Sequence, residues 1–287
     1  MTSAVRVDGA VDLHCHFGPE PVVERVTGGR AAVTPETAAR EAAKEGQRAI
    51  VLKPHEFPTV GVAHALNDAI DGVSIIGGIT CDAPIGGINP AAVRTALDNG
   101  ARVVWLPTLS AASAPDAKRS VAFGDAPACD VAVDGRLTDE VRDVIELTVQ
   151  HGAVLATGHI GRDEQFLLAE AMRQRGTLLV THALQNGVGP DLTVSDCVEL
   201  AALGAYLEFT AHTCQGQIGA FEDVINVIGQ VGVERCVLSS DLGWSEHLPH
   251  PAAGLTNYLR SLDSAGVSAR DLELMAGRTP ARLIGLE

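Results

Sequence analysis

Histidine, lysine and aspartate side chains follow short apolar segments at five points in the chain. The first point is Asp12-Leu13-His14-Cys15-His16, where a strand would place His14 and His16 on the same side because neighbouring side chains alternate. Two imidazoles at that spacing can chelate one divalent cation. The other four points are Lys53-Pro54-His55, Thr157-Gly158-His159, Thr181-His182 and Ser239-Ser240-Asp241.

The apolar segments are typical of short buried strands, and they alternate with helical patterns. Eight such alternations in 287 residues predict one α/β domain over residues 1–287, a (β/α)8 TIM barrel that ends in a helix at Ser268–Ala276. A doubly wound open sheet is the alternative, but no G-x-G-x-x-G sequence follows the first strand. The expected strands are Ala10–His14, Arg48–Lys53, Ser74–Thr80, Arg102–Leu106, Ala153–His159, Leu178–His182, Ala205–Phe209 and Cys236–Asp241.

The connection after the fourth strand is unusually long. About 30 residues separate that strand from the helical pattern that begins at Thr138, whereas most loops in compact domains have roughly 4–6 residues. In a barrel this loop would emerge at the face where active sites lie. We expect either a functional lid or a tolerated insertion.

Four histidines and one aspartate lie where expected strands end. The carboxyl ends of the strands of a barrel meet at one rim, so residues far apart in sequence converge there. A single histidine at a strand end is usually a hydrogen-bonded structural residue, but five such groups at four strand ends are hard to produce by chance. Imidazole and carboxylate together are the ligand set of zinc and similar cations. The predicted ligands are His14, His16, His159, His182 and Asp241.

These residues resemble, in order and position, those of the amidohydrolase superfamily of metal-dependent hydrolases, which includes phosphotriesterase-like and TatD-like barrels. The resemblance covers roughly Val11 to Asp241. It implies that His14, His16 and Asp241 hold one metal, and that His159 and His182 hold a second. It also implies a carboxylated lysine or a glutamate that bridges the two metals.

The bridging group departs from the family pattern. In phosphotriesterase-like and dihydroorotase-like members it comes from strand four, but here strand four reads VVWLPT. The suitable group is Lys53 at the end of strand two, beside strand one. A buried ammonium is costly, and burial or a nearby cation lowers the pKa of a lysine, so its amine can react with carbon dioxide. The alternatives are an ion pair of Lys53 with a substrate acid or a neighbouring carboxylate, and a site with one metal.

Further residues are expected to line the same rim. His55 lies two residues after Lys53 and is predicted to contact substrate, and Asp12 is predicted to orient a ligand histidine. For each of the others alone, a packing or solvent role is an open alternative. The predicted substrate contacts are His55, Trp105, His212, His247 and His250, and further candidates include Asp82, Thr108 and Glu208.

The predicted function is metal-assisted hydrolysis. A divalent cation acidifies a water, and Asp241 accepts its proton and returns it to the leaving group. We expect two zinc ions, with manganese or cobalt as alternatives, and N6-carboxylysine at Lys53. The predicted substrate is a small amide, cyclic amide, imide or lactone. A phosphoesterase, a decarboxylase with one metal and a catalytically silent binding protein are the alternatives.

Composition narrows the class of partner. The chain carries 21 basic and 36 acidic residues, a net charge of −15, and only 3% aromatic residues, which disfavours nucleic acid as a partner. No run reaches the roughly 18 apolar residues that span a bilayer, and the N-terminal residues show no signal-peptide pattern. Six scattered cysteines suggest reduced thiols and a cytoplasmic location. We expect a small-molecule substrate, no membrane partner, and leave a homo-oligomer open.

Overall fold

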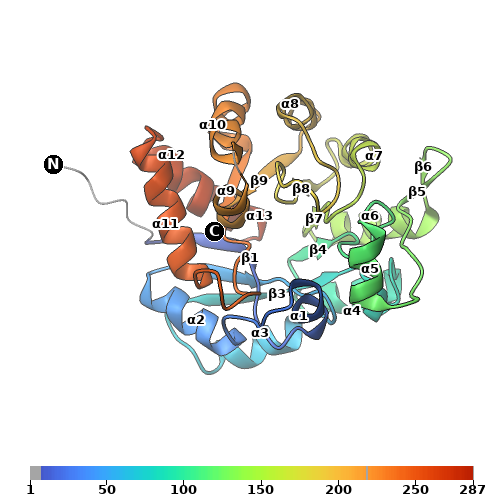
Figure 1. The fold of residues 1–287 in the computed structure, drawn as a ribbon, viewed down its shortest axis with the longest axis horizontal. Helices are drawn as coiled ribbons and strands as arrows, with labels where there is room; N and C mark the ends of the chain where they lie inside the picture. Colours follow the sequence, from blue (N-terminus) through green and yellow to red (C-terminus); the bar gives the residue numbers. More distant parts are fainter. Residues whose placement is uncertain (1–7, 218, 287) are drawn as a thin grey trace.

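Eight parallel strands form the centre of the protein in the computed structural model, which describes residues 8–217 and 219–286. The strands follow one another in the order β1-β2-β3-β4-β7-β8-β9-β10, and helices surround them (Figure 1). The predicted (β/α)8 barrel is therefore confirmed. The strands are β1 (Val11–Cys15), β2 (Ala49–Leu52), β3 (Ser74–Thr80), β4 (Val103–Trp105), β7 (Val154–Ala156), β8 (Thr177–Val180), β9 (Tyr206–Thr210) and β10 (Cys236–Ser239).

The barrel closes where the last strand meets the first. The amide of Asp241 donates to the carbonyl oxygen of His14 at 2.9 Å, and the amide of His16 donates to Leu242 at 2.9 Å. The Asp12 carboxylate accepts from the amides of His14, at 3.1 Å, and Ser240, at 3.0 Å. Asp12 thus joins the two strands through their main chains, and within residues 8–217 and 219–286 its hydrogen bonds go to these amides rather than to a histidine ring.

Strand β1 departs from regular alternation. Its pairing with β2 shifts register between Asp12 and Cys15. Leu13 consequently packs inside the barrel, whereas Cys15 packs in the cluster outside it. An unbroken strand would place these two side chains on one face. The shift is what turns His14 and His16 into the barrel mouth.

Helices cover the outside of the barrel between successive strands. Several begin at a capping threonine or asparagine, as at Thr34, Asn89, Thr138 and Thr193, whose side chains accept hydrogen bonds from the first helical turn. No helix within the described residues is both long and apolar enough to cross a bilayer. The covering helices are α2 (Pro35–Lys44), α3 (Val60–Asn67), α4 (Pro90–Asp98), α6 (Asp139–Gln150), α7 (Arg162–Met172), α8 (Val194–Ala202), α9 (Ala211–Gly216), α10 (Ala220–Val231) and α11 (Pro251–Ser264).

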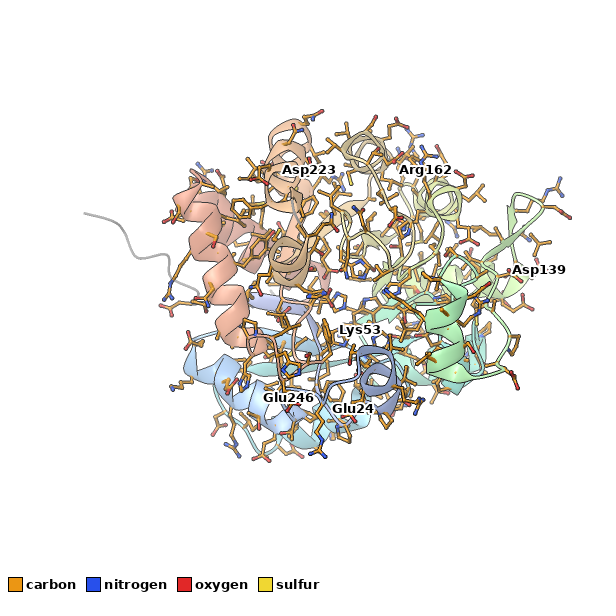
Figure 2. The ribbon with its side chains drawn as sticks, in the orientation of Figure 1. Glu24, Lys53, Asp139, Arg162, Asp223 and Glu246 are labelled. Carbon is orange, nitrogen blue, oxygen red and sulfur yellow. The ribbon has the colours of Figure 1, made fainter. Side chains whose placement is uncertain are left out.

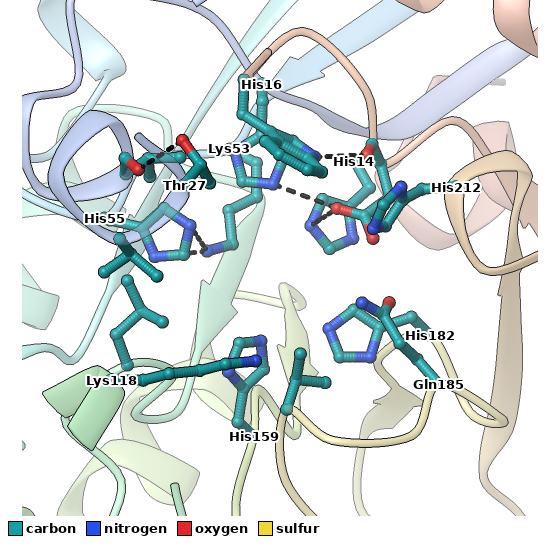
Figure 3. A pocket seen from close by; sticks show the side chains of 16 residues that line it. His14, His16, Thr27, Lys53, His55, Lys118, His159, His182, Gln185 and His212 are labelled. Carbon is teal, nitrogen blue, oxygen red and sulfur yellow. Dashed lines mark hydrogen bonds and ion pairs between the residues drawn. The ribbon is translucent and has the colours of Figure 1, made fainter. Parts of the chain in front are cut away.

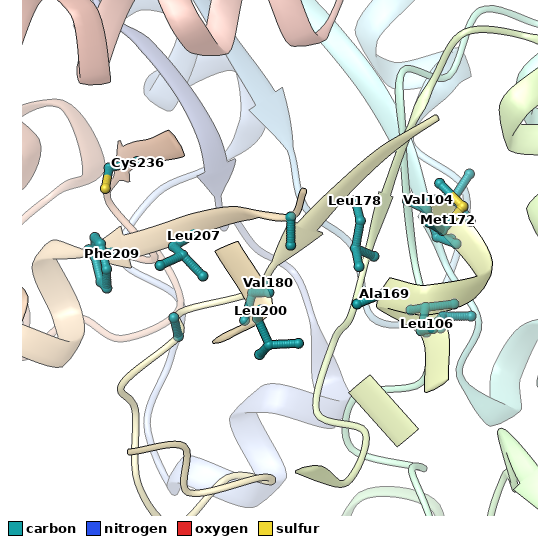
Figure 4. Packing of buried hydrophobic residues seen from close by; sticks show 14 of the residues in the cluster. Val104, Leu106, Ala169, Met172, Leu178, Val180, Leu200, Leu207, Phe209 and Cys236 are labelled. Atoms are coloured by element: carbon teal, nitrogen blue, oxygen red, sulfur yellow. The ribbon is translucent and has the colours of Figure 1, made fainter. Parts of the chain in front are cut away.

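The apolar core has an inner and an outer part. Trp105 fills the barrel interior together with Val11, Leu13 and Val51. The outer part lies between strands and helices, where Leu178 and Val180 of β8 pack near Leu200 of α8 (Figure 4). A barrel built this way is solid, so a substrate can reach only its rims.

Three segments differ from the sequence expectation. The loop after β1 forms α1 (Pro21–Thr27), and the long connection after β4 contains α5 (Asp116–Phe123) and a hairpin of β5 (Ala132–Val133) and β6 (Arg136–Leu137). The expected terminal helix is longer than predicted, because α12 (Ala269–Glu273) runs through a π-helical turn at Leu274–Arg278 into α13 (Thr279–Leu283). Short 3-10 turns lie at Ala83–Ile85 and Val233–Arg235.

Gly243, directly after the closing strand, provides a test of this rim. Its φ is 113°, and a methyl group there would overlap the carbonyl oxygen of His16. We expect Gly243→Ala to lower the free energy of unfolding by about 1–3 kcal/mol. Urea denaturation measures this change.

Gly229, in the exposed part of α10, is the matched control. Nothing lies within 4 Å of the position that its Cβ would take. Gly229→Ala should raise the free energy of unfolding by about 1 kcal/mol, because alanine is the better helix former. Equal urea midpoints for Gly243→Ala and the unmodified protein would contradict the steric argument.

Candidate metal centre

Three donor atoms converge at the mouth of the barrel. His14 Nε2 lies 3.3 Å from Asp241 Oδ1, and His16 Nε2 lies 3.1 Å from the same oxygen (Figure 3). The ligand atoms of these three residues all lie within 4.8 Å of one another, and all three residues are buried. Two imidazoles and a carboxylate in this arrangement fit a first-row divalent cation.

Two buried glutamates hold the chelating histidines. Glu208 Oε2, on β9, accepts a hydrogen bond from His14 Nδ1 at 3.0 Å and another from the amide of His182 at 3.2 Å. Glu20 Oε2 lies 3.6 Å from His16 Nδ1. Each carboxylate occupies the Nδ1 side of its histidine and leaves Nε2 facing Asp241, which is how metal-binding imidazoles are oriented in proteins.

The charges in this cluster depend on one another. Burial acts to raise the pKa of Asp241, but His14 and the hydrogen bond from His16 outweigh it and hold that pKa well below its usual value. Burial acts to lower the pKa of His16, but the contacts with Asp241 and Glu20 outweigh it and raise that pKa. Asp241 is therefore ionised, as a metal ligand must be.

His159 and His182 lie on the opposite side of the mouth. Their ring centroids are 4.9 Å apart, and the ring of His182 is 5.8 Å from that of His14. Burial lowers the pKa of His182 to about 4 and, with His182 beside it, lowers the pKa of His159 well below its ordinary value. Both rings are neutral at pH 7 and have a nitrogen available for a cation.

Backbone strain occurs at two of the predicted ligands. His182 has a φ of 31° and Asp241 a φ of 54°, both in the left-handed region that non-glycine residues rarely adopt. Such conformations persist only when the surroundings fix them, and they concentrate at functional sites. The strain is consistent with side chains that are held for a purpose other than stability.

Lys53 is buried at the centre of the mouth, whereas Asp139, Arg162 and Asp223 lie over the outer helices (Figure 2). Its Nζ donates to the carbonyl oxygen of Pro54 at 3.1 Å and lies 3.3 Å from His55 Nδ1. Burial lowers the pKa of Lys53 to about 8, although Asp82 and other nearby acids act to raise it. A larger fraction of this amine is therefore neutral than in an exposed lysine.

His55 is fixed from below by a buried polar network. Its Nδ1 lies 2.9 Å from Thr108 Oγ1, and Thr108 donates to Asp82. Asp82 Oδ1 also accepts from Ser110 Oγ at 2.6 Å. Burial acts to raise the pKa of Asp82, but the hydrogen bond to His55 and the positive charges nearby outweigh it and lower that pKa to about 2.

A cavity of about 180 Å³ opens above these groups. It is smaller than the roughly 300–1,000 Å³ typical of sites for drug-sized ligands, so it suits a small metabolite. Its lining comprises His14, His16, Val23, Val26, Thr27, Lys53, His55, Leu109, Lys118, His159, His182, Gln185, Val188, His212, Asp241 and Trp244.

The cavity contains only part of the predicted substrate-contact set. His55 and His212 line it, and the ring of His212 meets Trp244 edge-on at 4.9 Å. Trp105 lies outside the lining because it fills the barrel beneath Lys53, whose Nζ is 5.6 Å from its ring. His247 is also outside the lining, and His250 instead contacts Glu41 at 2.9 Å.

Two residues of the site were not singled out from the sequence. Glu20 lies four residues after His16, and its Oε2 lies near the ring of that histidine. The other carboxylate oxygen of Glu20, Oε1, accepts a hydrogen bond from the amide of His55. Lys118 comes from α5, which sequence periodicity did not reveal. Their charge was the available signal in the sequence, and it is weak because charged residues are common on protein surfaces.

The chain matches one known family by sequence and several solved structures by fold. A family model described as "Family of unknown function (DUF6282)" matches residues 9–208, and no sequence among curated proteins matches the chain. The fold is similar to that of an amidohydrolase from Pseudomonas aeruginosa, with 11% identity, 98% of this chain and 97% of that chain covered, and a TM-score of 0.65.

Two further solved structures share the fold. An amidohydrolase from Burkholderia multivorans has 14% identity, coverage of 97% and 99%, and a TM-score of 0.63. A 2,6-dihydroxybenzoate decarboxylase from Rhizobium has 11% identity, coverage of 97% and 99%, and a TM-score of 0.59. The resemblance to the amidohydrolase superfamily is thus confirmed at the level of the fold.

The contact between Glu208 and His14 gives a prediction about metal binding. Glu208→Gln should weaken the binding of an added divalent cation by roughly 10–100-fold, because the amide no longer fixes and polarises His14 as a carboxylate does. Competition with a chelator measures this affinity. Glu170→Gln, on the exposed face of α7, is the matched control, and equal affinities for the two variants would refute the orienting role.

Proposed function

The chain belongs to the DUF6282 family, and we propose that it is a metal-dependent hydrolase of small molecules. The observation that carries the proposal is the convergence of His14, His16 and Asp241 at the open end of a barrel. The names of its structural neighbours include two amidohydrolases. A divalent cation held by these residues would supply an acidified water and a polarised carbonyl oxygen.

Asp241 is the proposed general base. Its carboxylate is buried, ionised and bordered by His14 and His16, so it can accept a proton from a water in the mouth and deliver it to the leaving group. The buried surroundings strengthen every charge interaction at this point. His55 and His212, which both line the cavity, are the proposed substrate contacts.

The proposed substrate is an amide, a cyclic amide or imide, or a lactone. The size of the cavity limits the substrate to a small metabolite, and the acidic character of the chain disfavours polyanions. An assay of the purified protein with panels of amides, lactones and phosphoesters, in zinc, manganese or cobalt, tests the choice. Turnover of phosphoesters alone would overturn it.

We further propose that Lys53 is carboxylated and joins the His14–His16–Asp241 site to a second site at His159 and His182. Burial supports this role, because it favours the neutral amine that reacts with carbon dioxide. The position of Lys53 in the lining, with all five predicted ligands around the same cavity, supports it as well. Zinc is the proposed metal.

Asp241→Asn tests the general base. Turnover should fall by about 10²–10⁴-fold, because the amide cannot accept the proton, while much of the metal is retained through the histidines. Steady-state kinetics and elemental analysis give the two quantities. Asp139→Asn, on the exposed start of α6, is the control, and unchanged turnover in Asp241→Asn would refute the assignment.

Lys53→Ala tests the bridge. The variant should contain less metal than the unmodified protein, and added acetate or propionate should restore part of the metal and the activity by replacing the lost carboxylate. Lys44→Ala, in the last turn of α2, is the control. A fully metallated and active Lys53→Ala variant would eliminate the bridge.

Decarboxylation is the second candidate function. Within residues 8–217 and 219–286, the hydrogen bonds of Lys53 Nζ go to Pro54 and His55 rather than to the three convergent donors, an arrangement that suits a single metal. One structural neighbour is named as a decarboxylase. One metal per chain together with an unmodified Lys53 would favour this alternative.

A further inference from the structure

Lys118 reaches into the cavity from outside the barrel. It lies on α5, in the long connection after β4, and its side chain extends along the edge of the cavity beside His159 (Figure 3). Its Nζ donates to the carbonyl oxygen of Gly187 at 2.8 Å. This contact joins α5 to the loop after β8 and fixes the ammonium group at the cavity wall.

The lining reverses the charge balance of the chain. The sequence has only three lysines, Lys44, Lys53 and Lys118, and 36 acidic residues. Two of these lysines line the cavity, whereas Asp241 is the one carboxylate among the lining residues that the structure describes. Because Asp241 is engaged by His14 and His16, and Lys53 is assigned to the proposed bridge, Lys118 is the lysine of the lining that remains to offer positive charge to a ligand.

The two lysines differ in their availability. Lys53 is fully buried and its amine contacts Pro54 and His55. Lys118 is half-buried, and among the described residues no carboxylate lies within ion-pair distance of it. A neutral carbonyl partner leaves two of its three N–H donors and its whole charge for an anion.

Apolar side chains also line the cavity. They are Val23 and Val26 of α1, Leu109, Val188 and Trp244, and they lie among polar lining residues such as Thr27 and Gln185. A ligand that fills the cavity therefore needs a short apolar part as well as polar groups. The volume of about 180 Å³ limits it to a few carbon atoms or one small ring.

We propose that the cavity binds small carboxylic acids whose carboxylate pairs with Lys118 while the reacting carbonyl faces His14, His16 and Asp241. The proposal rests on the proposed function for the position of the reacting bond, and it adds the substrate class. Lys118 would select an acid over its neutral analogue and would set the distance between the acid group and the reacting carbonyl.

Calorimetric titration with half-amides of short diacids tests the proposal. The probes are succinamate, glutaramate and adipamate, each compared with its neutral diamide. At least one acid should bind the unmodified protein about tenfold or more tightly than its diamide, as expected for one charge-assisted pair. Binding of every diamide as tightly as its acid, or no binding of any acid, would overturn the proposal.

Variants at Lys118 separate charge from tethering. Lys118→Gln keeps a donor for Gly187 but removes the charge, so it should lose the preference for the acid, whereas Lys118→Arg should retain most of it. Lys44→Gln, the control, should bind each acid and its diamide as the unmodified protein does. A preference that persists in Lys118→Gln would overturn the proposal, even if that variant melts at the same temperature.

This test is independent of catalysis. Binding and turnover are measured in separate experiments, so unchanged activity in Asp241→Asn would refute the hydrolase while leaving the acid subsite intact. Conversely, a Lys118→Gln variant that keeps its preference removes the acid subsite without affecting the role of Asp241. With a hydrolysable acid, Lys118→Gln should raise KM about tenfold and leave kcat nearly unchanged.

Discussion

The hydrogen bond from the Asp241 amide to the His14 carbonyl oxygen is the contact on which the site depends. It joins the last strand of the barrel to the first, and with it Asp241 arrives beside His14 and His16, more than 220 residues away in sequence. Asp12 reinforces the same seam from within, through the amides of His14 and Ser240. Closure of the barrel and assembly of the donor cluster are therefore one event.

Buried carboxylates lie near the contact between the first and last strands. Glu20, Asp82, Glu208 and Asp241 are all buried in or beneath the mouth, and each is matched by histidines or by Lys53. Buried ionised groups rarely add net stability, because removing them from water costs several kcal/mol per ion. Groups kept in this way at one rim indicate selection for chemistry rather than for stability.

Much of the fold was predictable because buried parallel strands read as continuous apolar runs. His14, His16, His159, His182 and Asp241 could be identified because each follows such a run. The register shift in β1 could not be foreseen, since alternation assumes a regular strand.

The positions of the other rim residues and of two short helices depend on tertiary structure that sequence periodicity does not encode. Trp105 ends β4 just as the rim residues follow the other strands, and one step along a strand decides whether a side chain fills the barrel or lines the cavity. The loop after β10 places His250 against Glu41, a contact set by tertiary packing. Helices α1 and α5 are only seven and eight residues long, too short for an apolar stripe to identify them.

Helices α1 and α5 lie at the cavity and share a small apolar cluster of their own, here called the roof. Val22, Leu109 and Ala122 pack together apart from the clusters of the barrel, and Arg25 donates to the carbonyl oxygen of Ala122. Such a unit can open or change with little effect on the stability of the rest. Substitutions in α1 and α5 can thus change the part of the cavity wall formed by Val23, Val26 and Lys118 while the barrel strands that carry His14, His16 and Asp241 keep their places.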